Sequence, residues 1–178
     1  MNSIDDVNTL IDAGRDPNLS QIIRNFPTGV GKKPVEQVIL THSHYDHAEM
    51  ITQIRKEFNP LVYAYPSYQK ADRYLTGGEF IKIADRICEI IYAPGHSNDS
   101  ICIYSKQDGI LFTGDLPLNV RDTNGTYQYD YIQVLETLVT KKINVIYPGH
   151  DAPIIVDAEN MLRNSLDNAR KTLRSKEK

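Results

Sequence analysis

Hydrophobic and polar positions along this chain follow two periodicities, one typical of strands and one typical of amphipathic helices. In the first half of the chain, segments with the two periodicities alternate. Strand-like runs are predicted at 7–11, 35–40 and 61–65, and helical patterns at 19–26, 48–58 and 66–75. Proline supports two boundaries, because Pro27 follows the first helical pattern and Pro66 suits the first turn of the third.

The second half begins with strands and ends with helices. Short β-rich runs are predicted at 80–84, 87–93, 101–105 and 110–113, and Gln107-Asp108-Gly109 is a hairpin signal between the last two. A helical stripe of Tyr131, Leu135 and Leu138 precedes a strand at 144–147, and a C-terminal helix places Leu162, Leu166, Ala169 and Leu173 on one face. No linker or repeat interrupts this order, so we expect a single α/β domain over residues 1–178.

Composition limits the function classes. The chain has 178 residues, of which 40% are hydrophobic and 24% charged, as in ordinary globular proteins. Its net charge of −3 provides no global positive field that would attract nucleic acid or anionic membranes. We therefore expect a small-molecule substrate, no nucleic acid and no membrane, and we leave open whether the chain forms a homo-oligomer.

The first residues lack the cationic start and apolar run of a signal peptide, and no stretch approaches the ~20 apolar residues of a spanning helix. We therefore expect a cytoplasmic protein. Cys88 and Cys102 lie inside apolar segments, where free cysteine packs as a small hydrophobe. A disulfide or a thiolate metal ligand is not expected from them.

All five histidines fall in short polar motifs that interrupt or close apolar runs. The motifs are His42-Ser43-His44-Tyr45-Asp46-His47, Gly95-His96-Ser97 and Gly149-His150-Asp151. Neutral imidazole is the commonest protein metal ligand. Moreover, His42, His96, Asp115 and His150 each lie at or just past the carboxyl end of a predicted strand, where α/β folds build their sites. The sequence therefore predicts a metal site assembled from distant segments.

The first motif has its own geometry. Side chains of an extended chain alternate faces, so His42, His44 and Asp46 would point the same way. His47 can join them only if the backbone turns at Asp46-His47, where the next helix begins. The motif then offers His42 with His44 to one ion and Asp46 with His47 to a neighbouring ion. Further ligands must come from elsewhere, because a metal position needs three or four.

Taken singly, the later motifs have structural alternatives. A lone histidine such as His96 in a Gly-His turn is more often a hydrogen-bonded loop residue than a ligand. Asp115 by itself suits a turn or a helix cap, and we interpret Asp12, close to Gly14, as structural for the same reason. Only His-x-His-x-Asp-His is specific alone, because close imidazoles repel one another as cations unless a metal holds them neutral.

Together these motifs resemble the metallo-β-lactamase superfamily. His42-x-His44-x-Asp46-His47 is similar to its signature, and Pro94-Gly95-His96-Ser97, Thr113-Gly114-Asp115 and Tyr147-Pro148-Gly149-His150 match its later motifs in order. The resemblance runs from about Val7 to the C-terminus. It implies an α/β fold, a four-layer αββα sandwich of two mixed β-sheets flanked by helices. Because only about six residues precede Val7, we expect the usual N-terminal strands to be lacking.

The resemblance assigns the metal ligands in two sets with one shared residue. They are His42, His44 and His96 for one ion, Asp46, His47 and His150 for the other, and Asp115 for both. It implies two divalent ions, with zinc as the default and iron or manganese as alternatives. Asp46 and Asp115 are the expected catalytic residues: a hydroxide between the ions would attack a carbonyl carbon, and Asp46 would orient it.

The resemblance favours a minimal, glyoxalase-II-like hydrolase of a small thioester, ester or lactone. Two alternatives stay open: a mononuclear-iron oxygenase resembling the persulfide dioxygenases, and a metal-binding protein without catalysis. Since the covering loop of the family lies between early strands, we also expect an open site. Its selectivity would then depend on Tyr45, on the segment 118–131, or on a second subunit.

Overall fold

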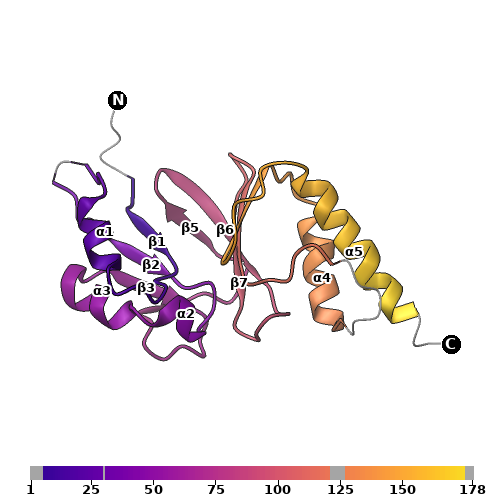
Figure 1. Ribbon diagram of the computed structural model, residues 1–178, viewed down its shortest axis with the longest axis horizontal. Coiled ribbons are helices and arrows are strands. Elements are labelled where there is room, and N and C mark those ends of the chain that lie inside the picture. Colours follow the sequence, from indigo (N-terminus) through magenta and orange to yellow (C-terminus); the bar gives the residue numbers. More distant parts are fainter. Residues whose placement is uncertain (1–5, 30, 121–126, 175–178) are drawn as a thin grey trace.

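The computed structural model describes residues 6–29, 31–120 and 127–174, with side chains up to residue 172 (Figure 1). The elements follow in chain order: β1 (Thr9–Ile11), α1 (Leu19–Asn25), β2 (Gln37–Ile39), α2 (Tyr45–Ala48), α3 (Ile51–Phe58), β3 (Leu61–Ala64), β4 (Arg73–Tyr74), β5 (Phe80–Ile83), β6 (Arg86–Tyr92), β7 (Ile101–Ser105), β8 (Ile110–Gly114), α4 (Tyr129–Leu138), β9 (Val145–Pro148) and α5 (Ala158–Arg174). Most strands and helices predicted from the sequence are confirmed within a few residues.

The first sheet has the strand order β1-β2-β3-β4. Its central strand β2 is buried on both faces, and a strand covered on both sides reads as a continuous apolar run. Val38 packs in one cluster with Ile23 of α1 and Ile54 of α3, whereas Ile39 packs against the second sheet. The helices α1 and α3 therefore cover the outer face of this sheet (Figure 1).

The second sheet has the order β5-β6-β7-β8-β9. Its outer face is covered by α4 and α5, because Leu135 and Leu162 share a cluster with Cys102 and Leu111. Cys88 lies in the cluster between the sheets, and both cysteines are free and buried, as predicted. Within the described ranges, every helix is too short or too polar to span a bilayer.

The two sheets face one another, with helices on both outer sides, so the αββα sandwich is confirmed (Figure 1). One detail differs. Only the five-stranded sheet is mixed, since β8 and β9 are parallel there and its other pairs antiparallel, whereas the described pairs of the four-stranded sheet are all parallel. Helical crossovers connect β1 to β2 and β2 to β3, and such crossovers join parallel strands.

The helix predicted over residues 66–75 is wrong. This segment makes two turns and then forms β4 beside β3. Its backbone amides bond across to the neighbouring strand: Asp72 N–H donates to the Val62 carbonyl at 2.8 Å and Leu75 N–H to the Ala64 carbonyl at 3.0 Å. In a helix these amide groups would donate to carbonyl groups of the same segment, whereas here they donate to β3.

Candidate metal centre

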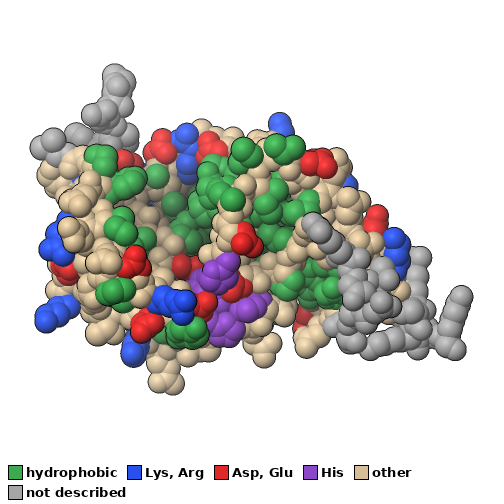
Figure 2. All heavy atoms as spheres, viewed as in Figure 1, with side chains coloured by type: hydrophobic (Ala, Val, Ile, Leu, Met, Phe, Trp, Pro, Cys, Tyr) green, Lys and Arg blue, Asp and Glu red, His purple; other side chains and the backbone are tan. Residues whose placement is uncertain are grey.

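The ends of four strands meet at one edge of the sandwich. Since β7 is antiparallel to β6 and β8, and β9 is parallel to β8, the strands β6, β8 and β9 all run toward this edge. Beyond their ends lie His96, Asp115 and His150. The first sheet contributes the His42 motif after β2, and the Ile101 amide of β7 donates to the Thr41 carbonyl at 2.8 Å. The two sheets are thus joined where the histidines gather (Figure 2).

All seven predicted site residues come together here, in two adjacent groups. One group is His42, His44 and His96, and the other is Asp46, His47, Asp115 and His150; within each group the candidate ligand atoms lie within 4.8 Å of one another. The division follows from the chain turning into α2 at Tyr45, one residue before the turn that the sequence predicted. As expected, the first motif contributes His42 and His44 to one group and Asp46 and His47 to the other.

Asp115 lies between the groups. Its Oδ2 is 3.6 Å from His96 Nε2 and 3.9 Å from His42 Nε2 in the three-histidine group. In the other group, its Oδ1 is 3.2 Å from His47 Nε2, and its Oδ2 is 3.3 Å from His150 Nε2. A carboxylate in this place can contribute one oxygen to each of two neighbouring positions.

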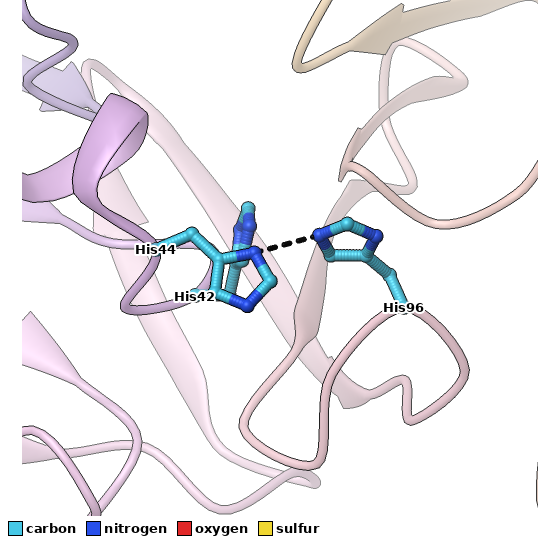
Figure 3. Close-up of side chains that lie close together, drawn as sticks. All are labelled: His42, His44 and His96. Carbon is cyan, nitrogen blue, oxygen red and sulfur yellow. Dashed lines mark hydrogen bonds between the residues drawn. The ribbon is translucent and has the colours of Figure 1, made fainter.

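The three histidines of the first group face one another across a small space (Figure 3). His44 Nδ1 and His96 Nε2 are 2.8 Å apart, and the three ring centroids are separated by 4.7 to 4.9 Å. The rings come from two loops, since His42 and His44 follow β2 and His96 follows β6. Nitrogen atoms converging in this way suit a single small cation.

Asp12, interpreted from the sequence as structural, also orients a ligand, which is a correction. Its carboxylate accepts hydrogen bonds from the Thr41 amide at 2.7 Å and the Thr41 hydroxyl at 2.8 Å, and lies 2.8 Å from His47 Nδ1. If the neutral His47 ring donates from Nδ1, its Nε2, which faces Asp115, carries no proton. Burial lowers the pKa of His47, but the hydrogen bond to Asp12 and the nearby carboxylates outweigh burial and raise the pKa above its usual value.

His42 is held by the same network. The Thr41 hydroxyl donates to Asp12, so its oxygen can accept from His42 Nδ1 at 3.2 Å, which leaves His42 Nε2 without a proton. Burial, followed by the nearby His47, lowers the pKa of His42 to about 4. The ring is therefore neutral at physiological pH, which is the form that binds metals.

The residues present fit divalent ions. His42 Nε2, His47 Nε2 and Asp115 Oδ1 are buried and have no hydrogen-bond partner. Buried polar atoms are almost always paired, and three that face the same space without a hydrogen-bond partner suit a bound cation. The donors are nitrogen and carboxylate oxygen, the types that zinc, iron and manganese accept.

Sequence reasoning missed the contribution of two carboxylates, those of Asp12 and Asp99. Because β1 is parallel to β2, both strands end at the same sheet edge. Asp12, which directly follows β1, therefore lies at the same edge as His42. That position was a usable signal. Asp99, three residues after His96, contacts both histidine loops, and only the folded chain brings those loops together.

Clefts open on both sides of His150. One of about 500 Å³ lies beside His96, Asp115 and His150 and has an apolar part. That part is formed by Leu116, Leu118, Ile154 and Met161. The other cleft, of about 530 Å³, includes Arg15 and Tyr45. The His150 side chain is 58% exposed. The predictions of an open site and of a selectivity segment at 118–131 also involve residues 1–5 and 121–126, which lie outside the described residues.

Known proteins resemble the chain in sequence and in fold. A hydroxyacylglutathione hydrolase of Francisella tularensis subsp. novicida (strain U112) is 32% identical over 145 residues, covering 76% of this chain and 57% of the relative. The chain thus spans little more than half the length of the curated relatives it matches. TTHA1623, solved in a di-iron-bound form, has a TM-score of 0.67 at 21% identity, covering 84% of this chain and 85% of its own.

A flavodiiron protein from Giardia intestinalis has a TM-score of 0.73 at 22% identity, covering 95% of this chain and 50% of its own. At these identities the solved structures establish the fold. The family model described as Metallo-beta-lactamase superfamily matches residues 4–150, which include all five histidines. With the fold, the paired ligand groups and this match in agreement, the chain belongs to the metallo-β-lactamase superfamily.

Proposed function

We propose that this chain is a metal-dependent hydrolase that binds two divalent ions, with zinc as the expected metal, and cleaves a small thioester, ester or lactone. The observation that carries the proposal is the convergence of two donor groups that share Asp115. The substrate class is supported by the relative from Francisella, since a hydroxyacylglutathione is a thioester.

When bound, divalent ions lower the pKa of water toward neutrality and polarise a carbonyl oxygen. The chain contributes positioning and a carboxylate. Desolvation raises the pKa of Asp46, but the hydrogen bond from its own amide and the His47 and His150 rings outweigh desolvation and lower the pKa overall. Asp46 is thus ionised, and its Oδ2, 3.3 Å from His150 Nε2, can accept a hydrogen from the attacking water and orient it.

The apolar part of the cleft beside Asp115 suits the acyl group of such a substrate. Leu116 and Leu118 follow β8 directly, so they lie next to Asp115 in the chain as well as in space. Met161 of α5 adds an adaptable side chain to the same wall. An acyl chain placed there would bring its carbonyl carbon close to the shared carboxylate.

The proposal is tested by metal analysis of the untreated protein, followed by turnover assays with thioesters, lactones and phosphodiesters. We expect about two divalent ions per chain and turnover of at least one thioester, ester or lactone. About one iron per chain with oxygen uptake would instead support the oxygenase. Full metal content without turnover of any substrate would support a protein that only binds metal.

Once a substrate is found, His44→Ala and Asp115→Ala remove one donor from the first group and the shared donor, respectively. Both should lower turnover by more than the about 10–100-fold typical of changes outside the ligand shell, because a ligand itself is lost. Asp167→Ala, an exposed carboxylate on α5, is the matched control and should keep wild-type turnover. Unchanged turnover in both ligand variants would falsify the hydrolase proposal.

A further inference from the structure

Asp99 connects the two loops that carry the three-histidine group. Its Oδ2 accepts the Ser43 amide at 3.0 Å, and its Oδ1 accepts the Ser97 hydroxyl at 2.6 Å. Ser43 stands between His42 and His44 in the chain, and Ser97 directly follows His96. One carboxylate is therefore bonded to a neighbour of every histidine in the group.

A third contact attaches this carboxylate to the first sheet. The Ser67 hydroxyl, just beyond β3, donates to Asp99 Oδ2 at 3.4 Å. The Ser97 hydroxyl also lies 2.7 Å from the Ser100 hydroxyl, so the loop after β6 is closed by its own hydrogen bonds around the aspartate. Asp99 thus fixes the distance between the His96 loop and the loop after β2. The geometry of the three-histidine group depends on this distance.

The carboxylate is buried and still ionised. Asp99 is only 8% exposed. Burial raises its pKa, but the hydrogen bonds from Ser43 and Ser97 outweigh burial and bring the pKa below its usual value. A buried charge is retained when its hydrogen bonds are satisfied, and here those bonds hold two catalytic loops together.

The second group has a different, half-buried carboxylate behind it. Asp12 contacts Thr41 and His47. It contacts His47 directly and reaches His42 only through the Thr41 hydroxyl, whereas the bonds of Asp99 go to the two loops that carry the three-histidine group. A change at Asp99 should therefore act mainly on the three-histidine group.

We propose that Asp99 is a positioning residue that sets the metal affinity of the three-histidine group by holding the His42–His44 loop against the His96 loop. This inference rests on the proposed metal binding but not on any substrate. Supporting residues outside the ligand shell typically change metal affinity about 10–100-fold. The Asp99 effect should have this size and should be confined to one of the two ions.

The test uses metal-free full-length protein titrated with Zn²⁺ against a competing chelator, and cadmium NMR to observe the two positions separately. Asp99→Asn keeps the volume and one acceptor oxygen, and Asp99→Ala removes all the hydrogen bonds. The matched control is Asp108→Asn, a carboxylate that accepts from Ser105 Oγ at 2.7 Å and Arg86 Nε at 3.0 Å in the hairpin at the other end of β7.

Both Asp99 variants should bind one ion about tenfold or more weakly and the second ion as the wild type does, and one cadmium resonance should broaden or disappear. Asp108→Asn should lower thermal stability without changing either affinity. Wild-type affinity for both ions in folded Asp99→Asn would overturn the inference, as would an equal loss at both positions. If the wild type binds no ion, the proposed function itself fails, so the two failures are distinguishable.

Discussion

Gly149 allows the backbone to pass directly beside the candidate metal centre. A Cβ atom at this position would meet the Asp115 Oδ1 atom, and it would lie 2.7 Å from His47 Cε1. The close approach is fixed by a hydrogen bond of 2.8 Å from the Gly149 amide to the Gly114 carbonyl. Any larger residue at this position would displace the side chains of Asp115 and His47, which belong to the candidate ligand set. Glycine is therefore required before His150.

Gly149→Ala should weaken metal binding and lower turnover by about tenfold or more, because the methyl group shifts ligands whose orientation sets affinity. Zn²⁺ titration with a chelator and a turnover assay provide the measurement. Gly78→Ala is the control, since open space surrounds it but its φ of +92° makes alanine strained. That variant should lose stability alone, and equal metal affinities for both variants would contradict the argument.

At the scale of elements, Asp72 explains why the segment 66–75, predicted as a helix, contains the edge strand β4 instead. Its carboxylate accepts the Val62 amide of β3 at 2.8 Å, and Arg55 of α3 donates to it at 3.0 and 3.1 Å. One side chain thereby links the helix α3 to two strands. The hydrogen bond from Val62, and after it Arg55, lower the pKa of Asp72 below its ordinary value.

Since the pKa of Asp72 is lower in the folded chain, its charged form stabilises the fold above the unfolded pKa, and this stabilisation is lost as the pH falls through the folded pKa. Asp72→Asn should therefore cost about 1 kcal/mol near neutral pH. The difference in unfolding free energy between the wild type and the variant should shrink below the ordinary pKa of 3.8. Denaturant unfolding at several pH values measures it; a difference that grows toward acid pH would refute the assignment.

At the scale of the whole molecule, the candidate metal centre lies where the two sheets meet. His42, His44, Asp46 and His47 belong to the half built on the parallel sheet, whereas His96, Asp115 and His150 belong to the half built on the mixed sheet. Each ligand group takes residues from both halves. Bound ions would therefore hold the sheets together at this edge, beyond what the apolar cluster between them provides.

Metal removal should accordingly lower the unfolding temperature of the whole chain. Free ion at a hundred times its dissociation constant stabilises the folded state by about 2.7 kcal/mol, which corresponds to about 5–10 °C for a chain of this size. Calorimetry with and without a chelator, followed by Zn²⁺ restoration, measures the shift. Asp115→Asn, which weakens both groups, should show a smaller shift, and an equal one would argue against ligation by Asp115.

Much of the architecture could be read from local pattern, because apolar periodicity reports which face of an element is buried. The run at 35–40 and the stripe of Tyr131, Leu135 and Leu138 are examples, since all these positions except Glu36 are buried in the folded chain. Residues 66–75 show the limit of this reasoning. Their pattern suits a helix, but hydrogen bonds to β3 give the segment a lower-energy alternative that local sequence does not contain.

By itself the sequence determined which atoms are available to bind a metal and the edge where they gather, because residue types set the first and their place after strands sets the second. Its local geometry also predicted how the first motif divides if the chain turns there, and the turn into α2 at Tyr45 meets that condition. Only the tertiary structure placed Asp115 between the groups and put Asp12 and Asp99 behind the histidines. Those contacts join residues that are 19 to 68 positions apart in the chain. Whether such residues meet is set by the packing of the two sheets and not by local sequence.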